Sequence, residues 1–244
     1  MSRLIFEQAY VVIIPTYKSA EKHEHSMLHL FLGSGITADV NGTVCSGNAI
    51  FVSGNVMHNC PKGETDAVIL IDPTSALAES IERQFLKGEE CFGLDIKGYE
   101  SLLLHKGRIS EQNDSKIISG IKEILSLLDL DTSKKRQTDP RIVQLLKSIR
   151  AYEYVDKKVS DVAKQLNYSE SYLTHLFKKE AGISLKSYLM MSQLEYTWKQ
   201  VQKGISITQA ALDAGYSSPS HFAMICKKTT GLSLTDTDMI KADF

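Results

Sequence analysis

The 244-residue chain lacks any apolar run long enough to cross a bilayer, since a membrane-spanning helix needs about 20 consecutive apolar residues. Residues 1–30 also lack the basic start, apolar segment and small-residue cleavage site of a secretory signal. These absences predict a cytoplasmic protein that makes no contact with a membrane.

Cysteine is scarce, and its spacing excludes one class of metal site. The four cysteines, Cys45, Cys60, Cys91 and Cys226, have none of the short spacings that are typical of zinc ligands. In a reducing compartment we expect all four to be free thiols.

The chain also lacks a strong excess of positive or negative charge, and its formal net charge is −1. The two halves differ, however. Residues 139–244 hold 14 Lys and Arg against 11 Asp and Glu, whereas residues 1–138 hold 14 against 18. A mildly basic half joined to an acidic half fits a nucleic-acid-binding domain attached to a second domain. The length and the hydrophobic content of 43% allow both halves to have their own cores.

The first half shows short runs of β-branched and aromatic residues, which predict an antiparallel sheet. We expect strands within residues 4–14, 27–32, 44–52 and 67–71. Gly33-Ser34-Gly35 and Asn41-Gly42 predict turns, because Asn-Gly favours a tight hairpin. Residues 75–86 predict a helix, and residues 90–104 are ambiguous.

A further helix is predicted over residues 110–128, where apolar side chains recur at spacings of three and four. The stripe is wide for a helix that packs on one side only. We give equal weight to a helix packed on its own domain and to one that also forms a homodimer interface. The interface residues would be Ile117, Ile121, Ile124, Leu125 and Leu128.

A polar stretch, residues 129–139, has no apolar pattern and predicts an exposed linker. A new helix follows, with Thr138 or Asp139 as its N-cap and Pro140 in its first turn.

The second half contains two copies of one pattern, residues 159–179 and 207–228. Each copy predicts a short helix, a turn and a second helix, which together form a helix-turn-helix unit. A helix of ~18 residues from Leu185 joins the two units and spans ~27 Å at ~1.5 Å per residue. That length suits two units placed in successive major-groove segments, ~34 Å apart, of duplex DNA.

These residues resemble the DNA-binding domain of the AraC/XylS family of bacterial transcription regulators. The matching positions are Ala163, Leu166, Tyr168, Ser169, Tyr172, Leu173, Leu176, Phe177, Lys178, Lys179, Gly182, Tyr188, Leu189, Ile207, Ala210, Ala211, Gly215, Tyr216, Ser217, Ser220, Phe222, Lys227, Lys228 and Gly231. The resemblance implies an all-α C-terminal domain that activates or represses transcription, with RNA polymerase as a partner.

The family pattern also implies which residues contact DNA. The residues expected to contact bases are Ser171, Thr174 and His175 in the first recognition helix, and Ser220, Ala223 and Met224 in the second. The residues suited to phosphates are Lys178, Lys179, Lys227 and Lys228. For the lysines, the alternative is a solvated helix end favoured by the helix dipole.

Several positions depart from the family pattern. They are Gln193 for arginine, Thr197 for alanine, Met224 for an arginine-type residue, Cys226 for an aromatic residue and Leu234 for proline. Ala223 and Met224 cannot donate paired hydrogen bonds to guanine. We therefore hypothesise that the first recognition helix discriminates bases and the second mainly binds phosphate. The alternative is that the second unit is purely structural.

The first half resembles the cupin-like sensor domain common in this family. His23-Glu24-His25 and His29 resemble one cupin motif, with His29 in the place of a glutamate. Residues 53–59, which include His58, resemble the second, with Ser53 in place of a proline. The resemblance implies an α+β chain in which an antiparallel cupin-like β-barrel with helices, residues 1–130, precedes a linker, 131–139, and the DNA-binding domain, 140–244.

The resemblance also implies that the four histidines converge on one pocket. Four imidazoles can form a metal site, but they also serve as plain hydrogen-bonding groups. We expect a small-molecule effector pocket lined by His23, His25, His29 and His58, without metal or cofactor. No arrangement typical of catalysis is present, so we expect no enzyme activity. The alternatives are a cupin-type metalloenzyme and a regulator controlled by a protein partner.

Overall fold

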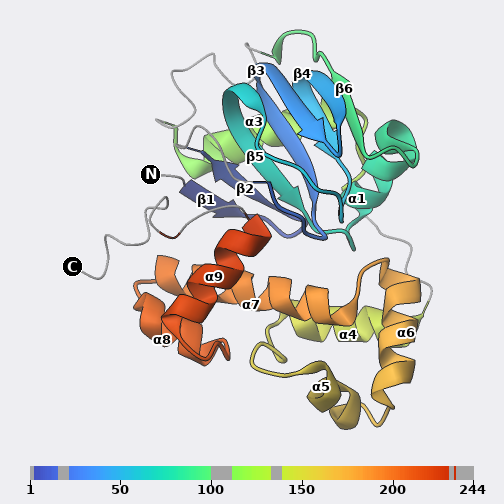
Figure 1. The fold of residues 1–244 in the computed structure, drawn as a ribbon, viewed down its shortest axis with the longest axis vertical. Helices are drawn as coiled ribbons and strands as arrows, with labels where there is room; N and C mark the ends of the chain where they lie inside the picture. The colour runs from blue at the N-terminus through green and yellow to red at the C-terminus, as the bar shows by residue number, and fades with distance from the viewer. Residues whose placement is uncertain (1–2, 16–21, 100–111, 133–138, 231–233, 235–244) are drawn as a thin grey trace. The chain divides into compact units, whose positions relative to one another are not determined.

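The computed structural model describes residues 3–15, 22–99, 112–132, 139–230 and 234. Most of the predicted linker and Gly231 lie outside the described residues. The chain divides into two compact units, Met1–Lys135 and Arg136–Phe244 (Figure 1). Among the described helices, none is both long and apolar enough to cross a membrane.

The first unit is built on one antiparallel sheet with the strand order β1-β2-β5-β3-β4-β6 (Figure 1). The strands are β1 Arg3–Phe6, β2 Tyr10–Ile14, β3 Leu28–Val40, β4 Thr43–Val52, β5 Lys62–Ile71 and β6 Cys91–Leu94. Each predicted strand region is confirmed, and the first forms two strands. The short strand β6 lies in the stretch whose sequence was ambiguous.

The two predicted turns have different outcomes. Asn41 and Gly42 both have positive φ, 49° and 87°, and connect β3 to β4 as a tight hairpin. The turn at Gly33-Ser34-Gly35 is wrong, because β3 continues through it with a shift in register between Leu32 and Ile36. Gly33 lies so close to the Glu64 carbonyl that an added Cβ would clash with it. The glycines therefore allow a β-bulge within the strand.

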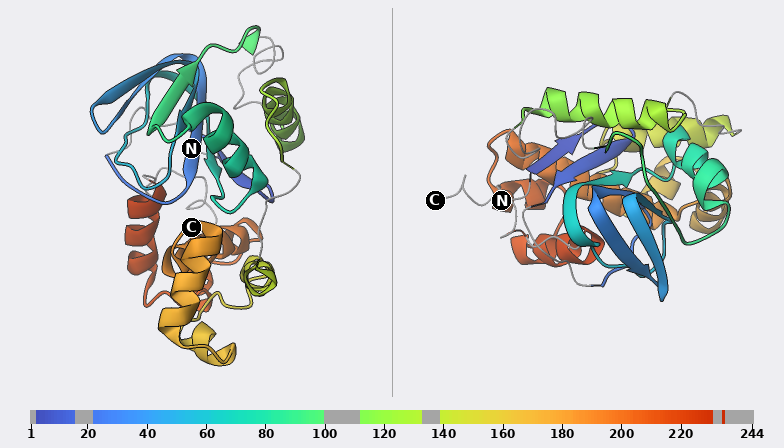
Figure 2. Two further views of the ribbon diagram at one scale, coloured as in Figure 1. Left: turned by 90° about the vertical axis from the view of Figure 1, so that its right-hand side faces the viewer. Right: turned by 90° about the horizontal axis from the view of Figure 1, so that it is seen from above.

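Three helical segments accompany the sheet, and α3 covers one of its faces (Figure 2). They are α1 Ala76–Ile81, the π-helix η1 Glu82–Leu86 and α3 Asp114–Leu127. Ser75 caps α1, and its hydroxyl accepts a hydrogen bond from the Ala78 amide. The helix predicted over residues 75–86 is thus present, but its second half is a π-helix.

The apolar stripe of α3 packs into the core of its own unit. Ile117, Ile121, Ile124 and Leu125 are at most 1% exposed and belong to this core, and Leu128 packs against it. The exposed positions of α3 are mainly polar, with Leu127 as the large apolar exception. The dimer interface predicted from these five residues is therefore not supported, and the alternative of a helix packed on its own domain describes α3.

The prediction of four free thiols is wrong for two cysteines. Cys45 of β4 and Cys91 of β6 form a disulfide, whereas Cys60 and Cys226 are free. The bonded cysteines are 46 residues apart in sequence, so only the fold of the sheet brings them together.

The second unit is helical, as predicted, and the expected α+β class is confirmed (Figure 1). Its helices are α4 Pro140–Arg150, α5 Val159–Gln165, α6 Glu170–Ala181, α7 Leu185–Gln202, α8 Ile207–Asp213 and α9 Pro219–Thr230. Asp139 is the N-cap of α4, and its side chain accepts from the Arg141 amide.

We predict that Ile121→Ala lowers the free energy of unfolding by about 2–5 kcal/mol, because it leaves a cavity in the core. The exposed Leu127 of the same helix provides the control, and Leu127→Ala should change stability by less than about 0.5 kcal/mol. Urea unfolding followed by circular dichroism measures both. A loss in Ile121→Ala that disappears at high protein concentration would instead indicate a subunit interface.

Candidate functional site: a nucleic-acid interface and a histidine cluster

Two helix-turn-helix units, α5–α6 and α8–α9, lie at opposite ends of α7 (Figure 1). Their turns share one backbone feature, a left-handed residue, which is Asn167 with φ 57° in the first and Gly215 with φ 86° in the second. The second helix of each unit starts at a serine cap. Ser169 accepts from the Tyr172 amide at 3.2 Å, and Ser218 accepts from the His221 amide at 3.1 Å.

The long helix α7 contributes to the buried core of both units. Near its start, Tyr188 packs its ring 5.7 Å from that of Phe177 in α6. Further along, the Trp198 ring lies 5.9 Å from that of Phe222 in α9. All four residues are at most 4% exposed. The second helix of each unit is therefore fixed to the same rigid element.

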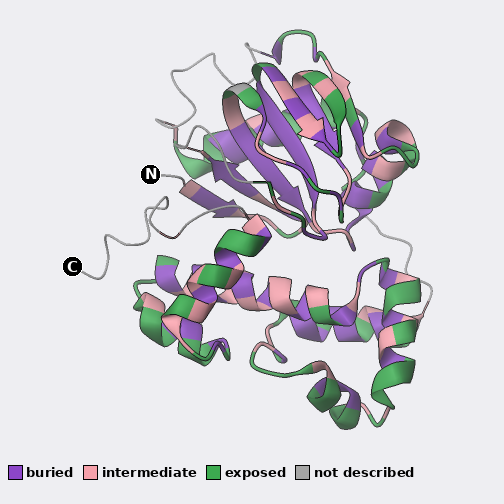
Figure 3. Ribbon diagram, viewed as in Figure 1, coloured by how far each residue is buried: buried purple, intermediate pink, exposed green. Residues whose placement is uncertain are grey.

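The predicted DNA-contacting residues lie along one face of α6 and one face of α9. Their spacing of i, i+3, i+4 and i+7 places them on one side of a helix. Exposed residues recur along both helices (Figure 3). The exposed candidates are Ser171, His175, Lys178 and Lys179 in α6, and Ser220, Met224, Lys227 and Lys228 in α9. Thr174 and Ala223 are partly buried at the centre of each face.

The hydroxyl of Thr174 already bonds to its own helix. Its Oγ1 lies 2.9 Å from the Glu170 carbonyl and 3.0 Å from the Ser171 carbonyl, and the hydroxyl donates its single hydrogen to this pair. What remains for a base is an acceptor oxygen and a methyl group. Thr174 is therefore suited to an amino group of adenine or cytosine, or to the methyl group of thymine.

Three departures from the family pattern, Gln193, Thr197 and Cys226, have structural roles. Gln193 donates from Nε2 to the Ala214 carbonyl at the end of α8, at 3.1 Å. Thr197 and Cys226 are fully buried. The hydroxyl of Thr197 donates to the Gln193 carbonyl at 2.9 Å. These residues hold the second helix-turn-helix unit, α8–α9, in place and do not lie on the exposed face of α9.

Two residues near these faces were not predicted from the sequence. His221 of α9 lies with Nδ1 3.1 Å from the Ser217 hydroxyl, which orients its ring beside the N-terminus of the helix. Arg141 donates to the Tyr172 hydroxyl of α6 at 2.9 Å and is paired with Asp139. Hydrogen bonds from Arg141 lower the pKa of Asp139 to about 2. The contact between Arg141 and Tyr172 joins residues 31 positions apart, which no local pattern indicates, whereas Ser217 and His221 are only four residues apart.

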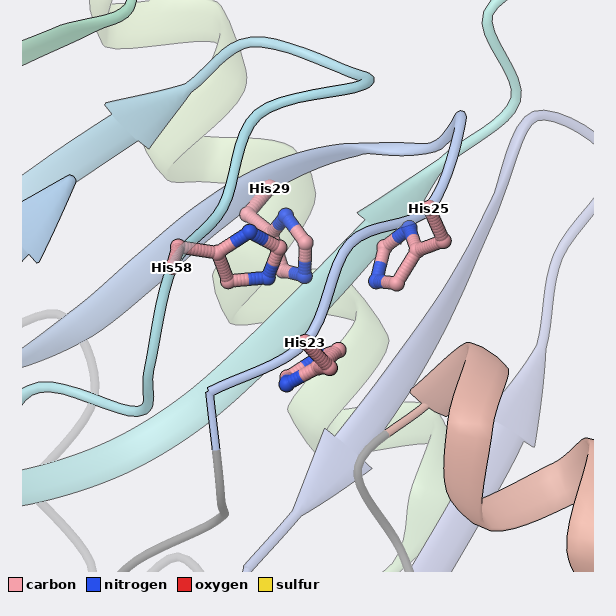
Figure 4. Close-up of side chains that lie close together, drawn as sticks. All are labelled: His23, His25, His29 and His58. Carbon is pink, nitrogen blue, oxygen red and sulfur yellow. The ribbon is translucent and has the colours of Figure 1, made fainter. Parts of the chain in front are cut away.

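The N-terminal unit, Met1–Lys135, contains the four histidines in one cluster (Figure 4). Each offers one ring nitrogen, and these atoms all lie within 4.8 Å of one another. His29 and His58 are closest, with ring centroids 4.2 Å apart, and His23 lies 4.5 Å from His58. The predicted convergence is thus present, and His25, His29 and His58 are buried.

Backbone hydrogen bonds hold the segments that carry these side chains. His23 and His58 exchange a pair of amide-to-carbonyl bonds of 2.9 and 3.0 Å, which forms an isolated β-bridge. The Asn55 amide donates to the His25 carbonyl at 2.7 Å. Gly54 is in such close contact with Ser26 that an added Cβ would lie 2.5 Å from its carbonyl oxygen. The cluster therefore depends on the approach of two loop segments.

His29 belongs to β3, and its side chain lies on the sheet face opposite to α3. Its neighbours Leu28 and Leu30 are part of the core beneath α3, and successive strand residues point to opposite faces. The ring of Phe31 stacks on that of His29 at a centroid distance of 5.0 Å. The cluster thus lies within the apolar interior of the curved sheet.

The environment keeps the imidazoles of His25, His29 and His58 neutral. Burial, and then the neighbouring histidines, lower the pKa of His25 and of His29 well below the ordinary value. Burial, opposed in part by a hydrogen bond to the Val56 carbonyl, lowers the pKa of His58 to about 4. At neutral pH each of the three rings therefore has one protonated nitrogen and one lone pair.

Three buried nitrogens of the cluster have no hydrogen-bond partner within the described part of the chain. They are Nε2 of His25, Nδ1 of His29 and Nε2 of His58. A buried polar atom without a partner costs about 1–3 kcal/mol. An arrangement of this kind is expected where a bound molecule or ion supplies the missing interaction.

Residues 162–238, which include both recognition helices, match the family model of a helix-turn-helix domain of the AraC type. The second unit therefore contains an AraC-type helix-turn-helix domain, and the curated relatives of the chain are transcription regulators. The resemblance inferred from the sequence is thereby confirmed.

Two curated AraC-type relatives differ in how much of the chain they match. The transcriptional regulator ExsA of Pseudomonas aeruginosa is 25% identical over 89% of this chain and 87% of its own length. The Msm operon regulatory protein of Streptococcus mutans is 27% identical over 48% of this chain, and the match spans 42% of that protein.

A solved structure of ToxT from Vibrio cholerae, bound to (E)-4-(8-methylnaphthalen-1-yl)but-3-enoic acid, has the same fold. It superimposes with a TM-score of 0.53 at 12% identity, over 96% of this chain and 100% of that one. The chain therefore shares the order of an N-terminal sheet and a C-terminal helical domain with this structure.

We predict that Lys178→Ala and Lys227→Ala each weaken binding to duplex DNA and make it less dependent on salt. Loss of one phosphate contact lowers the slope of log K against log salt concentration by about 0.9. Lys116→Ala, on the exposed side of α3 in the first unit, is the matched control and should leave the slope unchanged. Fluorescence anisotropy of a labelled duplex across a salt series measures all three. An unchanged slope in both test variants would exclude these lysines from the interface.

Proposed function

We propose that this AraC-type chain is a cytoplasmic regulator that binds a specific duplex DNA sequence through α6 and α9 and has no catalytic activity. The observation that carries the proposal is the pair of exposed recognition faces attached to one long helix. Two helices fixed in this way suit two segments of one major groove. The basic pairs at the C-terminal ends of α6 and α9 add attraction to phosphate.

We further propose that the two recognition helices have unequal roles. The α6 face presents hydrogen-bonding groups from Ser171, Thr174 and His175, which suit direct base contacts. In α9, Ser220 keeps a hydroxyl, but at the positions that match Thr174 and His175, Ala223 and Met224 offer only apolar surface, and Met224 is 59% exposed. The main task of α9 would then be to bind phosphate and to place α6.

The proposed domain organisation is a sensor domain, residues 1–130, a linker, 131–139, and a DNA-binding domain, 140–244. A small-molecule effector of the sensor domain fits the unpartnered nitrogens of the histidine cluster, and the fold neighbour ToxT carries a bound organic acid. RNA polymerase and a second copy of the chain are proposed as further partners. A dimer would need a surface other than the buried stripe of α3.

The proposal is tested by sequencing the duplexes that the full chain retains from a randomised library. A defined sequence preference in two adjacent segments is expected, with the stronger preference under α6. Recovery of no sequence preference, at salt concentrations where the chain still binds DNA, would contradict the proposal.

We predict that Thr174→Ala relaxes the preference at one base position and lowers affinity for the preferred sequence about fivefold, since one hydrogen bond contributes ~1 kcal/mol. Thr174→Val keeps the methyl group and replaces the hydroxyl with a second methyl group. It therefore distinguishes a hydrogen bond accepted by the Thr174 oxygen from a contact of its methyl group with thymine. It should behave like Thr174→Ala if the oxygen accepts a bond, and like the unsubstituted chain if the methyl contacts thymine. The same library selection measures both.

Met224→Ala is the matched substitution in α9 and should leave the sequence preference unchanged, because Met224 offers no donor or acceptor for a base edge. A loss of specificity in Met224→Ala as large as in Thr174→Ala would contradict the unequal roles. It would leave the proposal of DNA binding itself intact.

A further inference from the structure

The histidine cluster groups four imidazoles whose ring nitrogens are not all used by hydrogen bonds within the N-terminal unit. Four imidazoles come together, and no Cys, Asp or Glu joins them within the described residues. Three of their nitrogens are buried without a partner. Hydrogen bonds to backbone groups use Nδ1 of His25 and of His58, which leaves Nε2 of each ring without a partner among the described residues.

We propose that His23, His25, His29 and His58 bind one divalent transition-metal ion of the zinc, nickel and copper class. This inference concerns the same nitrogens to which an effector was assigned above, and it names a metal ion as their ligand. It does not depend on the proposed binding of DNA. The cluster belongs to the first unit, and its chemistry is separate from that of the recognition helices.

The size of the cluster fits such an ion after a small adjustment. A zinc ion with Zn–N distances of about 2.1 Å at a tetrahedral site has its ligand nitrogens about 3.4 Å apart. The nitrogens here lie within 4.8 Å of one another. Rotation of the imidazoles about their side-chain bonds can draw the atoms together while the backbone bridge between His23 and His58 is kept.

The ligand type selects the class of metal. Neutral imidazole nitrogen suits zinc, nickel, copper and iron, whereas calcium and magnesium require oxygen ligands. Since the cluster contains only imidazoles, it should not bind calcium or magnesium.

His58 and His25 are not equivalent as ligands. Nδ1 of His58 lies 2.8 Å from the Val56 carbonyl, which can only accept, so in the neutral ring Nε2 has the lone pair. A carbonyl partner of this kind is the usual support of a metal-binding histidine. Nδ1 of His25 accepts from the Met27 amide at 3.2 Å, so Nε2 carries the hydrogen. Metal binding through Nε2 of His25 would cost this bond, and we expect His25 to contribute less than His58.

The test uses the full chain purified without a histidine tag, stripped with a chelator and dialysed against zinc. Elemental analysis should find one zinc per chain, and calcium or magnesium at the same concentration should give none. Cobalt supplies a second measurement, because its visible spectrum should show nitrogen ligation without a thiolate band. Zinc or cobalt binding well below one ion per chain would overturn the proposal.

Substitutions assign the ion to the cluster. Loss of a direct ligand should exceed the 10–100-fold weakening typical of second-shell changes, so His58→Gln and His29→Gln should lower zinc affinity more than about 100-fold. His25→Gln should lower it less. The exposed His175 of α6 provides the control, and His175→Ala should retain full binding. Circular dichroism confirms that each variant is folded.

Equal zinc affinity in folded His58→Gln and in the unsubstituted chain would place the ion elsewhere and overturn the assignment. If His58→Gln does not fold, the cobalt spectrum of the unsubstituted chain still decides. A spectrum with thiolate ligation would point to Cys60 or Cys226 and contradict the proposed site.

Discussion

The packing of both helix-turn-helix units on α7 is the constraint on which the DNA-binding half depends. Tyr188 joins the core of the first helix-turn-helix unit, α5–α6, and Trp198 joins that of the second, α8–α9. One rigid helix therefore sets the distance and rotation between α6 and α9. Neither recognition helix is long enough to be stable alone. Each is stabilised because its apolar side is buried against α7 and against the first helix of its own helix-turn-helix unit, which leaves its polar side for DNA. Any weakening of α7 would therefore disturb both recognition faces together.

The same constraint explains why unusual residues are tolerated in the second unit. Gln193 keeps α7 attached to the end of α8 through the Ala214 carbonyl, and Cys226 fills buried space in α9. These are requirements of the core, and they are independent of what α9 presents to solvent. A recognition face can thus lose its base-contacting groups, as at Ala223 and Met224, while its helix stays in place. This separation of core from surface is the physical basis for assigning unequal roles to α6 and α9.

The features predicted from the sequence are those set by neighbouring residues. The Asn41-Gly42 hairpin and the Ser169 cap follow from local backbone preferences, and the second unit was found because it repeats the pattern of the first. Contacts distant in sequence escaped prediction. The bulge at Gly33 is forced by its approach to β5, and the Cys45–Cys91 disulfide depends on the approach of β6 to β4. For α3, the periodicity of the sequence predicted an apolar stripe, but it did not show whether the stripe packs against its own domain or against a second copy of the chain.

In the histidine cluster, one feature was predicted from the sequence and another was not. The resemblance to two cupin motifs predicted that the four side chains would meet, but not the tautomers, which are decided by the Val56 carbonyl and the Met27 amide. Those backbone contacts determine what the cluster can bind. An apolar interior that retains unpartnered imidazoles is less stable than one filled with aliphatic side chains, unless a ligand compensates. Since His23 and His58 also bridge two loop segments, a ligand held there would couple its own binding to the order of those segments. Such coupling is the minimum that a sensor domain requires.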